Sequence, residues 1–263
     1  MPVEQILSQN SKYIYGANIG AKRKYSFNKI LHGSSDRVDV EMVRDGQKEL
    51  RTLSRYSFEQ FKPTGHPTKQ WKILDNNVGY INLGRIDAKE LSQALDNLHN
   101  TKSIILDLRS YPKEFQGNTL KNYFGARCSE LVTVVKPYLL YPGKFEYSKQ
   151  TTTLVDPRYK GKVVLIVNQN TQSRAEYTAV WIQNGYNVTT VGSQTAGAGG
   201  VMISIEFLGG YHSNFTNSGF FYPDMSPIQR EGVKIDIEVN RTLKGVINGT
   251  DELLEKAIEI ASQ

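Results

Sequence analysis

The chain has 263 residues, of which 39% are hydrophobic and 22% charged, and this composition is typical of a globular protein with a packed core. The net charge is +6, but the basic residues are scattered and no aromatic-studded basic stripe accompanies them, which argues against a nucleic-acid-binding protein. A single cysteine, Cys128, excludes an intrachain disulfide framework and a multi-cysteine metal site.

Two further patterns are missing from the sequence. No run of about 18 apolar residues occurs, so no membrane span is predicted. Residues 2–14 mix polar and apolar side chains and do not form a signal peptide.

Cys128 has no histidine near it in sequence, and we expect a buried, unreactive thiol.

The first part of the chain predicts two helices and a hairpin. Apolar residues from Val3 to Ile14 follow helical spacing, and residues 21–31 can form a second helix that stops at Gly33. Two alternating runs flank Asp45-Gly46, a strong hairpin signal. Because an isolated hairpin is marginally stable in water, residues 1–58 are expected to be part of a larger module.

Residues 59–75 contain Pro63, Gly65 and Pro67 among polar side chains, and they are interpreted as a linker. Residues 76–263 then alternate strand and helix, which predicts an α/β core with right-handed crossovers. The expected strands are 78–83, 103–108, 163–167, 188–191, 202–208, 211–215, 220–222 and 235–239. The expected helices begin at the Asp87 capping box, at Ser173 and after Thr250.

Two loops follow core strands, at residues 168–176 and 192–200, where α/β folds place their sites. Ser173 opens a helix directly after a buried strand, so its hydroxyl is expected beside helix amides that can stabilise an oxyanion. The same Ser-x-x-Glu spacing to Glu176 is also a capping box, which is the commoner role for such a serine. The glycine-rich second loop matches neither the dinucleotide nor the Walker pattern, and its glycines indicate close approach of the backbone to a neighbour or ligand.

Several segments together resemble the C-terminal-processing, tail-specific and tricorn-like serine peptidases, especially those of Bacteroides-type bacteria. They are Val78-Gly79-Tyr80-Ile81-Asn82-Leu83, Ile105-Leu106-Asp107-Leu108-Arg109, residues 159–168 running on to Ser173-Arg174-Ala175-Glu176, Gly192-Ser193-Gln194-Thr195-Ala196-Gly197-Ala198, and Gly232-Val233-Lys234-Ile235-Asp236. Their order and spacing fit from about residue 72 to the end of the chain, and the combination is more specific than any one piece.

The resemblance implies a serine endopeptidase core of the ClpP/crotonase-like spiral βαβ fold over residues 76–263. Ser173 takes the place of the nucleophile, and the amide of Arg174 takes that of an oxyanion donor. Lys113 lies near the place of the second donor, where relatives carry a glycine pair. The lysine base of the processing branch would fall on Ala198, so that dyad is absent.

In the tricorn-like branch the base is a histidine that precedes a PDZ-like module, and residues 1–58 resemble the second half of such a module. The resemblance therefore places the base in an N-terminal segment missing from this sequence. Gln229 stands in place of a glutamate of that branch, and we keep it as a candidate catalytic residue. His32, His66 and His99 are expected to be structural or exposed.

The resemblance also implies a peptide or protein substrate, no metal and no cofactor, and a location in the cell envelope or outside the cell. Gly197, Ala198, Gly199 and His212 are the candidate substrate-binding residues. The second interpretation is a non-catalytic relative that binds peptides or other ligands, which Gln229 and the missing base favour. A third, an acyl-CoA enzyme of the crotonase kind, rests on fold kinship alone.

Overall fold

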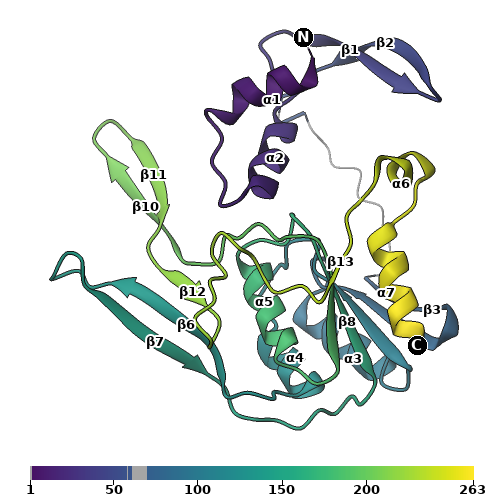
Figure 1. Ribbon diagram of the computed structural model, residues 1–263, viewed down its shortest axis with the longest axis vertical. Coiled ribbons are helices and arrows are strands. Elements are labelled where there is room, and N and C mark those ends of the chain that lie inside the picture. The colour runs from purple at the N-terminus through teal and green to yellow at the C-terminus, as the bar shows by residue number, and fades with distance from the viewer. Residues whose placement is uncertain (1, 58, 61–69) are drawn as a thin grey trace. The chain divides into compact units, whose positions relative to one another are not determined.

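The computed structural model describes residues 2–57, 59–60 and 70–263, and the chain forms two compact units (Figure 1). The first unit contains residues 1–15 and 22–68, and the second contains residues 16–21 and 69–263. His66 and much of the expected linker lie outside the described residues.

The first unit contains the predicted helices and hairpin. Its elements are α1 (Val3–Ser11), most of α2 (Ile19–Asn28), β1 (Arg37–Arg44) and β2 (Gln47–Ser54). Asp45 and Gly46 both have positive φ, 51° and 77°, which the tight turn of a right-twisted hairpin requires. The hairpin prediction is confirmed, with Arg44 paired to Gln47 next to the turn.

The second unit is built on a six-stranded sheet in the order β13-β9-β8-β5-β4-β3. The strands are β3 (Trp71–Leu74), β4 (Val78–Asn82), β5 (Ser103–Asp107), β8 (Lys162–Val167), β9 (Val188–Gly192) and β13 (Ile237–Glu238). All neighbours pair in parallel except β3 with β4. The linker prediction is wrong for β3, because this short edge strand pairs antiparallel with β4 inside the expected linker range.

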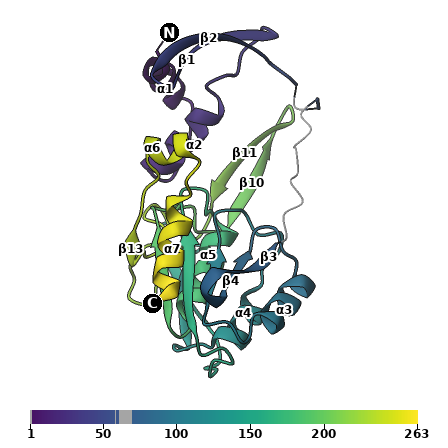
Figure 2. The ribbon, with the colours of Figure 1, turned by 90° about the vertical axis from the view of Figure 1, so that its right-hand side faces the viewer.

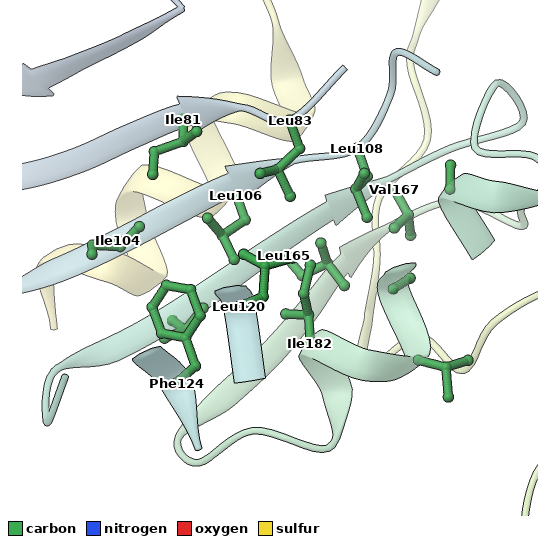
Figure 3. Close-up of a cluster of buried hydrophobic side chains, with 14 of the residues drawn as sticks. Ile81, Leu83, Ile104, Leu106, Leu108, Leu120, Phe124, Leu165, Val167 and Ile182 are labelled. Carbon is green, nitrogen blue, oxygen red and sulfur yellow. The ribbon is translucent and has the colours of Figure 1, made fainter. Parts of the chain in front are cut away.

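Two apolar layers cover the two faces of this sheet. Figure 2 shows helices on both sides of the sheet. Successive residues of a strand point to opposite faces, so Ile104 and Leu106 join one layer and Ile105 the other. The larger layer packs helices α3 (Ala88–Asn97), α4 (Gly117–Phe124) and α5 (Arg174–Gln183) against the sheet. Figure 3 shows it with Ile81, Leu83, Ile104, Leu106, Leu108, Leu120, Phe124, Leu165, Val167 and Ile182.

The opposite face is covered by α7 (Glu252–Ser262), whose buried residues include Leu253 and Ala257. The predicted closing helix is confirmed, but its cap is Asp251, which accepts from the Leu254 amide, and not Thr250. The capping box predicted for α3 at Asp87 is confirmed. A short helix, α6 (Leu243–Asn248), precedes α7 and was not predicted.

The aromatic-rich stretch from Tyr111 to Tyr159 holds α4, β6 (Glu130–Pro137) and β7 (Phe145–Thr151), none of which the sequence pattern predicted. β7 and β12 (Gly219–Phe221) flank β6 in a three-stranded sheet. A separate hairpin pairs β10 (Met202–Phe207) with β11 (Tyr211–Thr216). None of the helices in the described part of the chain is long and apolar enough to cross a membrane.

Candidate active site

Ser173 lies in a sharp turn between the carboxyl end of β8 and the first residue of α5. Its φ is 51° and its ψ is −112°, a backbone region that residues other than glycine rarely adopt. A serine on a strained strand-to-helix turn exposes its hydroxyl at the top of the sheet, as the nucleophile of many hydrolases does.

The helix-cap interpretation of Ser173 accounts for only part of this geometry. Cap residues ordinarily have extended backbone, and Asp87 (φ −91°, ψ 174°) and Thr242 (φ −102°, ψ 157°) have it in this chain. The Glu176 side chain does accept from the Ser173 amide at 2.9 Å, as in a capping box. The positive φ of Ser173 is not needed for capping, so it favours a functional role.

Glu176 is fully buried and joins the two loops that the sequence singled out. Its carboxylate accepts hydrogen bonds from the hydroxyl of Thr195 (2.6 Å) and from the amides of Ser173 (2.9 Å), Gly197 (2.6 Å) and Ala198 (2.9 Å). Burial raises the pKa of Glu176 above its ordinary value of 4.5, whereas these four bonds act to lower it. The carboxylate therefore fixes the backbone of Ser173 against the glycine-rich loop.

Further hydrogen bonds fix the loops 168–176 and 192–200 against their neighbours. The buried Thr171 hydroxyl donates to the Leu108 carbonyl at 2.9 Å, and the Thr171 carbonyl accepts from the Ala196 amide at 2.9 Å. Asn18, from the segment 16–21 of the same unit, donates to the carbonyls of Thr195 (2.8 Å) and Arg230 (3.2 Å). Local sequence patterns carry no signal for Asn18, because the contact joins residues far apart in the chain.

Arg174 has separate roles for its backbone and its side chain. Its amide, at the first position of α5, has no acceptor among the described residues, as expected of a helix N-terminus. Its guanidinium donates to the carbonyls of Lys113 (2.7 Å) and Pro112 (3.2 Å) and lies 5.5 Å from the ring centroid of Tyr111. The side chain thus anchors the loop after β5 next to Ser173.

Ser173 and Arg174 line an open pocket of about 430 Å³. Its other lining residues are mostly aromatic or apolar: Tyr111, Phe115, Gln150, Tyr177, Gly200, Val201, Met202 and Phe220. The ring centroids of Tyr177 lie 5.1 Å from Phe115 and 5.7 Å from Phe220, so these rings form one wall. Gln150 is a polar residue of the lining, and it accepts a hydrogen bond from the Tyr177 hydroxyl at 2.5 Å.

The predicted substrate-binding residues are not among the residues that line this pocket. Lys113 does not line the pocket, but its carbonyl accepts a hydrogen bond from Arg174, which does. Gly197 has φ 63° and a side chain there would collide with the Arg230 backbone, which explains the need for glycine. Gly199 packs against Ile228, and its neighbour Gly200, which was not among the candidate binding residues, lines the pocket.

His212 and Gln229 do not line the pocket. His212 is an exposed residue of β11, paired across the hairpin with Glu206. Gln229 is half-buried and lies beside Gly219 at the start of β12. His99 contacts the Tyr123 hydroxyl at 3.3 Å. No histidine or lysine is among the residues that line the Ser173 pocket in the described part of the chain.

Cys128 is exposed, so the prediction of a buried thiol is wrong. It lies in the loop between α4 and β6, where the Asn184 side chain binds both its amide (2.9 Å) and its carbonyl (2.8 Å). It lines a second pocket of about 450 Å³ near the C-terminal end of α5. Within the described ranges, no three His, Cys, Asp or Glu side chains gather in a way that could hold a metal ion.

Comparison with known proteins bears directly on this geometry. Residues 77–239, which include Ser173, Arg174 and Glu176, match the family model for peptidase family S41. The chain belongs to peptidase family S41. The resemblance to C-terminal-processing peptidases and the mixed α/β fold are confirmed.

Individual proteins and solved structures are also similar to this chain. The chain is 26% identical over 259 residues to the carboxy-terminal processing protease CtpA of Bacillus subtilis (strain 168), covering 90% of this chain and 49% of CtpA. It therefore spans about half the length of that relative. The fold is similar to mature CPAF in complex with lactacystin (TM-score 0.71, 13% identity, 99% of this chain and 75% of CPAF). It is also similar to the photosystem II D1 C-terminal processing protease (TM-score 0.51, 17% identity, 88% and 64%).

Proposed function

We propose that this chain carries the nucleophile and oxyanion site of an S41 serine endopeptidase that hydrolyses peptide bonds. The observation that carries the proposal is Ser173 itself, on a strained strand-to-helix turn at the edge of an open pocket. Membership of the peptidase family supports it. CtpA, to which the chain is similar, is a processing protease.

The proposed reaction uses few groups of this chain. The Ser173 oxygen attacks the peptide carbonyl carbon, its proton passes to a general base, and the oxyanion is stabilised by the amide of Arg174. The C–N bond then breaks as the leaving amine takes the proton from the base, and water hydrolyses the acyl-serine ester. Lys113 lies near the position of the second oxyanion donor. Gln229 is kept as a further candidate catalytic residue.

The general base is the group that the pocket lacks. We propose that it is a histidine contributed from an N-terminal segment outside this sequence, since neither histidine nor lysine lines the pocket and Ala198 occupies the lysine position of the processing branch. Without a base, a serine hydroxyl is a weak nucleophile at neutral pH. Activity of this chain alone is therefore expected to be low.

We also propose the finer domain assignment. Residues 76–263 form a ClpP/crotonase-like spiral βαβ core, and residues 1–58 are part of a PDZ-like module. The aromatic wall formed by Phe115, Tyr177 and Phe220 supports a substrate segment with apolar side chains near the cleaved bond. From the resemblance we also propose a location in the cell envelope or outside the cell.

A non-catalytic relative that binds peptides is the second candidate function. The observation that favours it is the absence of histidine and lysine from the lining of the pocket in the described residues. Such a protein would use the same apolar pocket to hold a peptide without cleaving it. Gln229, in the place of a glutamate, favours the same interpretation.

A serine-reactive fluorophosphonate separates the two functions. If Ser173 is a nucleophile, the intact chain becomes labelled as the Ser173 oxygen displaces fluoride, and Ser173→Ala abolishes the labelling. Ser193→Ala is the matched control, because Ser193 lies in the neighbouring loop and does not line the pocket, and it should label like the unmodified chain. Because the proposed base lies outside this sequence, labelling is expected to be slow and is followed at high reagent concentration and alkaline pH, where a serine hydroxyl depends less on a base. Absence of labelling under those conditions would favour the peptide-binding relative.

A further inference from the structure

The hairpin formed by β6 and β7 ends in an apolar apex, Leu139–Tyr141, that the Ser173 pocket does not explain. These three consecutive residues are strongly exposed, by 90% for Leu139, 84% for Leu140 and 67% for Tyr141. Single exposed apolar residues are ordinary, but a consecutive run of them indicates an interaction site. Figure 1 shows this hairpin extending away from the six-stranded sheet.

The apex is distant from the pocket along its own strand. Gln150 is the residue of β7 that lines the pocket, and β7 begins at Phe145. Extended strand rises roughly 3.3 Å per residue, so the apex lies roughly 17 Å or more from Gln150. A substrate side chain held beside Ser173 therefore does not cover the apex.

The turn that carries the apex is well defined. The Tyr138 amide donates to the Lys144 carbonyl at 2.8 Å, the Tyr141 amide donates to the Tyr138 carbonyl at 3.2 Å, and the Lys144 amide donates to the Tyr141 carbonyl at 3.1 Å. These bonds fix the backbone of the turn on which the two exposed leucines lie. Their exposure follows from the turn geometry.

Aromatic and basic side chains lie directly behind the apex. Phe145 and Tyr147 on β7 are 54% and 65% exposed. Lys144 lies 4.8 Å from the ring centroid of Tyr138, and Lys136 precedes the turn on β6. Residues 136–149 contain three lysines and one glutamate. Within the described ranges Lys136 and Lys144 form no ion pair, although Glu146 lies across the strands from Lys136.

We propose that the apex docks on the surface of an anionic lipid membrane. Leucines lie at the tip, and exposed aromatic rings and lysines are interspersed along the two strands behind it. An apolar tip suits the hydrocarbon edge of a membrane interface, and the rings and lysines suit its headgroup region. The net charge of +6 favours such a surface. This proposal does not depend on catalysis by Ser173.

A second copy of the chain fits the apex less well. A stable protein–protein contact buries roughly 800 Å² on each partner, and three side chains on a convex turn do not supply that area. A strongly positive chain also repels its own copy. Anionic lipid is therefore the occupant that charge and size both favour.

Co-sedimentation of the full chain with lipid vesicles tests the proposal. Vesicles of phosphatidylcholine containing about one third phosphatidylserine should bind the chain, added salt should weaken the binding, and phosphatidylcholine alone should bind little. The double variant Leu139→Ser/Leu140→Ser should lower the partition by about tenfold or more. Lys136→Gln/Lys144→Gln should lower it by about tenfold.

Leu208→Ser is the matched control for the leucine variant. Leu208 is 98% exposed at the apex of the β10–β11 hairpin, and residues 202–216 contain no lysine or arginine. This variant should bind anionic vesicles like the unmodified chain, and thermal unfolding should show all variants folded. The proposal fails if anionic vesicles do not bind at low salt, or if Leu208→Ser loses as much binding. A concentration-dependent dimer that Leu139→Ser/Leu140→Ser abolishes would also overturn it, in favour of a second copy.

Discussion

The backbone of Ser173, at φ 51° and ψ −112°, stores strain that glycine would release. Such a conformation costs about 1–3 kcal/mol for a residue with a Cβ, whereas glycine loses about 0.5–1 kcal/mol through its greater freedom in the unfolded chain. We therefore expect Ser173→Gly to have a free energy of unfolding about 1 kcal/mol higher than Ser173→Ala, measured by urea denaturation.

Both Ser173 variants lack the hydroxyl, so neither should be labelled by the fluorophosphonate. Comparing them separates backbone strain from the chemistry of the side chain. Equal stability of the two variants would mean that the turn is relaxed, and the strain argument for a nucleophile would be lost. A gain for glycine would be consistent with stability given up at a functional position.

Glu176 offers a second test at the residue scale. Its carboxylate accepts from four donors, and an amide in its place presents an NH₂ group to some of them. Buried donors without acceptors cost about 1–3 kcal/mol each. Glu176→Gln should therefore lower the free energy of unfolding by about 2–4 kcal/mol, measured by urea denaturation, and slow any labelling of Ser173.

Glu90→Gln is the matched control for this change. Glu90 closes the exposed capping box of α3 with Asp87, where water replaces lost hydrogen bonds. Its loss should cost less than about 1 kcal/mol. If the two substitutions cost the same, burial of the Glu176 network does not contribute to stability in the way we infer.

The sequence predicted the residues of this site better than their connections. Ser173 and Arg174 are candidates from the sequence because they follow a buried strand, whereas the sequence identifies Glu176 only as the capping-box partner of Ser173. The bonds of Glu176 to Gly197 and Ala198, and of Asn18 to Thr195, were not predicted. Contacts between distant residues depend on the packed fold, and local spacing carries no signal for them.

At the scale of elements, the helix α7 is tied to the sheet by a charged contact. Arg109 donates to Asp107 at 2.7 Å and to Asp251, the cap of α7, at 2.7 Å. Partial burial acts to raise the pKa of Asp251, but the hydrogen bond and charge of Arg109 outweigh it and hold the pKa below the ordinary value of 3.8. In the folded state the Asp251 carboxylate thus stays ionised at a pH where the same group takes up a proton in the unfolded chain.

This shift gives a signed pH dependence. A lowered pKa in the folded state contributes stability above the unfolded value of 3.8, and that stability is lost as the pH falls through the folded value. Asn is also a good helix cap, so Asp251→Asn removes mainly the charge. We expect it to lower the free energy of unfolding at pH 7, with a difference that shrinks as the pH falls below 3.8, measured by urea denaturation.

Glu259→Gln provides the control, because its pair with Lys256 is exposed and should contribute little at any pH. A penalty for Asp251→Asn that is the same at pH 7 and in acid would contradict the role of Arg109.

Helices and strands are predicted best where their burial requires a regular pattern of apolar residues. β5 is buried along its whole length, and its continuous apolar run predicts a strand. β7 is exposed along its whole length and carries no such pattern, so the sequence does not predict it. α4 and β6 both bury apolar residues, so exposure does not explain why the sequence analysis lacks them. The sequence predicts a linker at the position of β3, because this strand is four residues long and follows a proline- and glycine-containing stretch.

At the scale of the whole molecule, the two units differ sharply in how much apolar surface they bury. Both apolar layers consist of residues of the second unit. Among the described hydrophobic residues of the first unit only Ile14 is buried, while Val43 and Leu50 on the hairpin are 66% and 74% exposed. Since burial of apolar surface is the main favourable term in folding, stability should be concentrated in the second unit.

Native-state hydrogen exchange measures this difference directly. Amides of β1 and β2 should exchange through local openings of low free energy, whereas amides of β5 and β8 should exchange only through global unfolding and respond steeply to denaturant. Leu106→Ala, which opens a cavity at a fully buried position, should lower protection in β5 and β8 by about 2–5 kcal/mol and leave β1 and β2 unchanged. Equal protection throughout the chain, or a matching loss in β1 and β2, would mean that the two units unfold together.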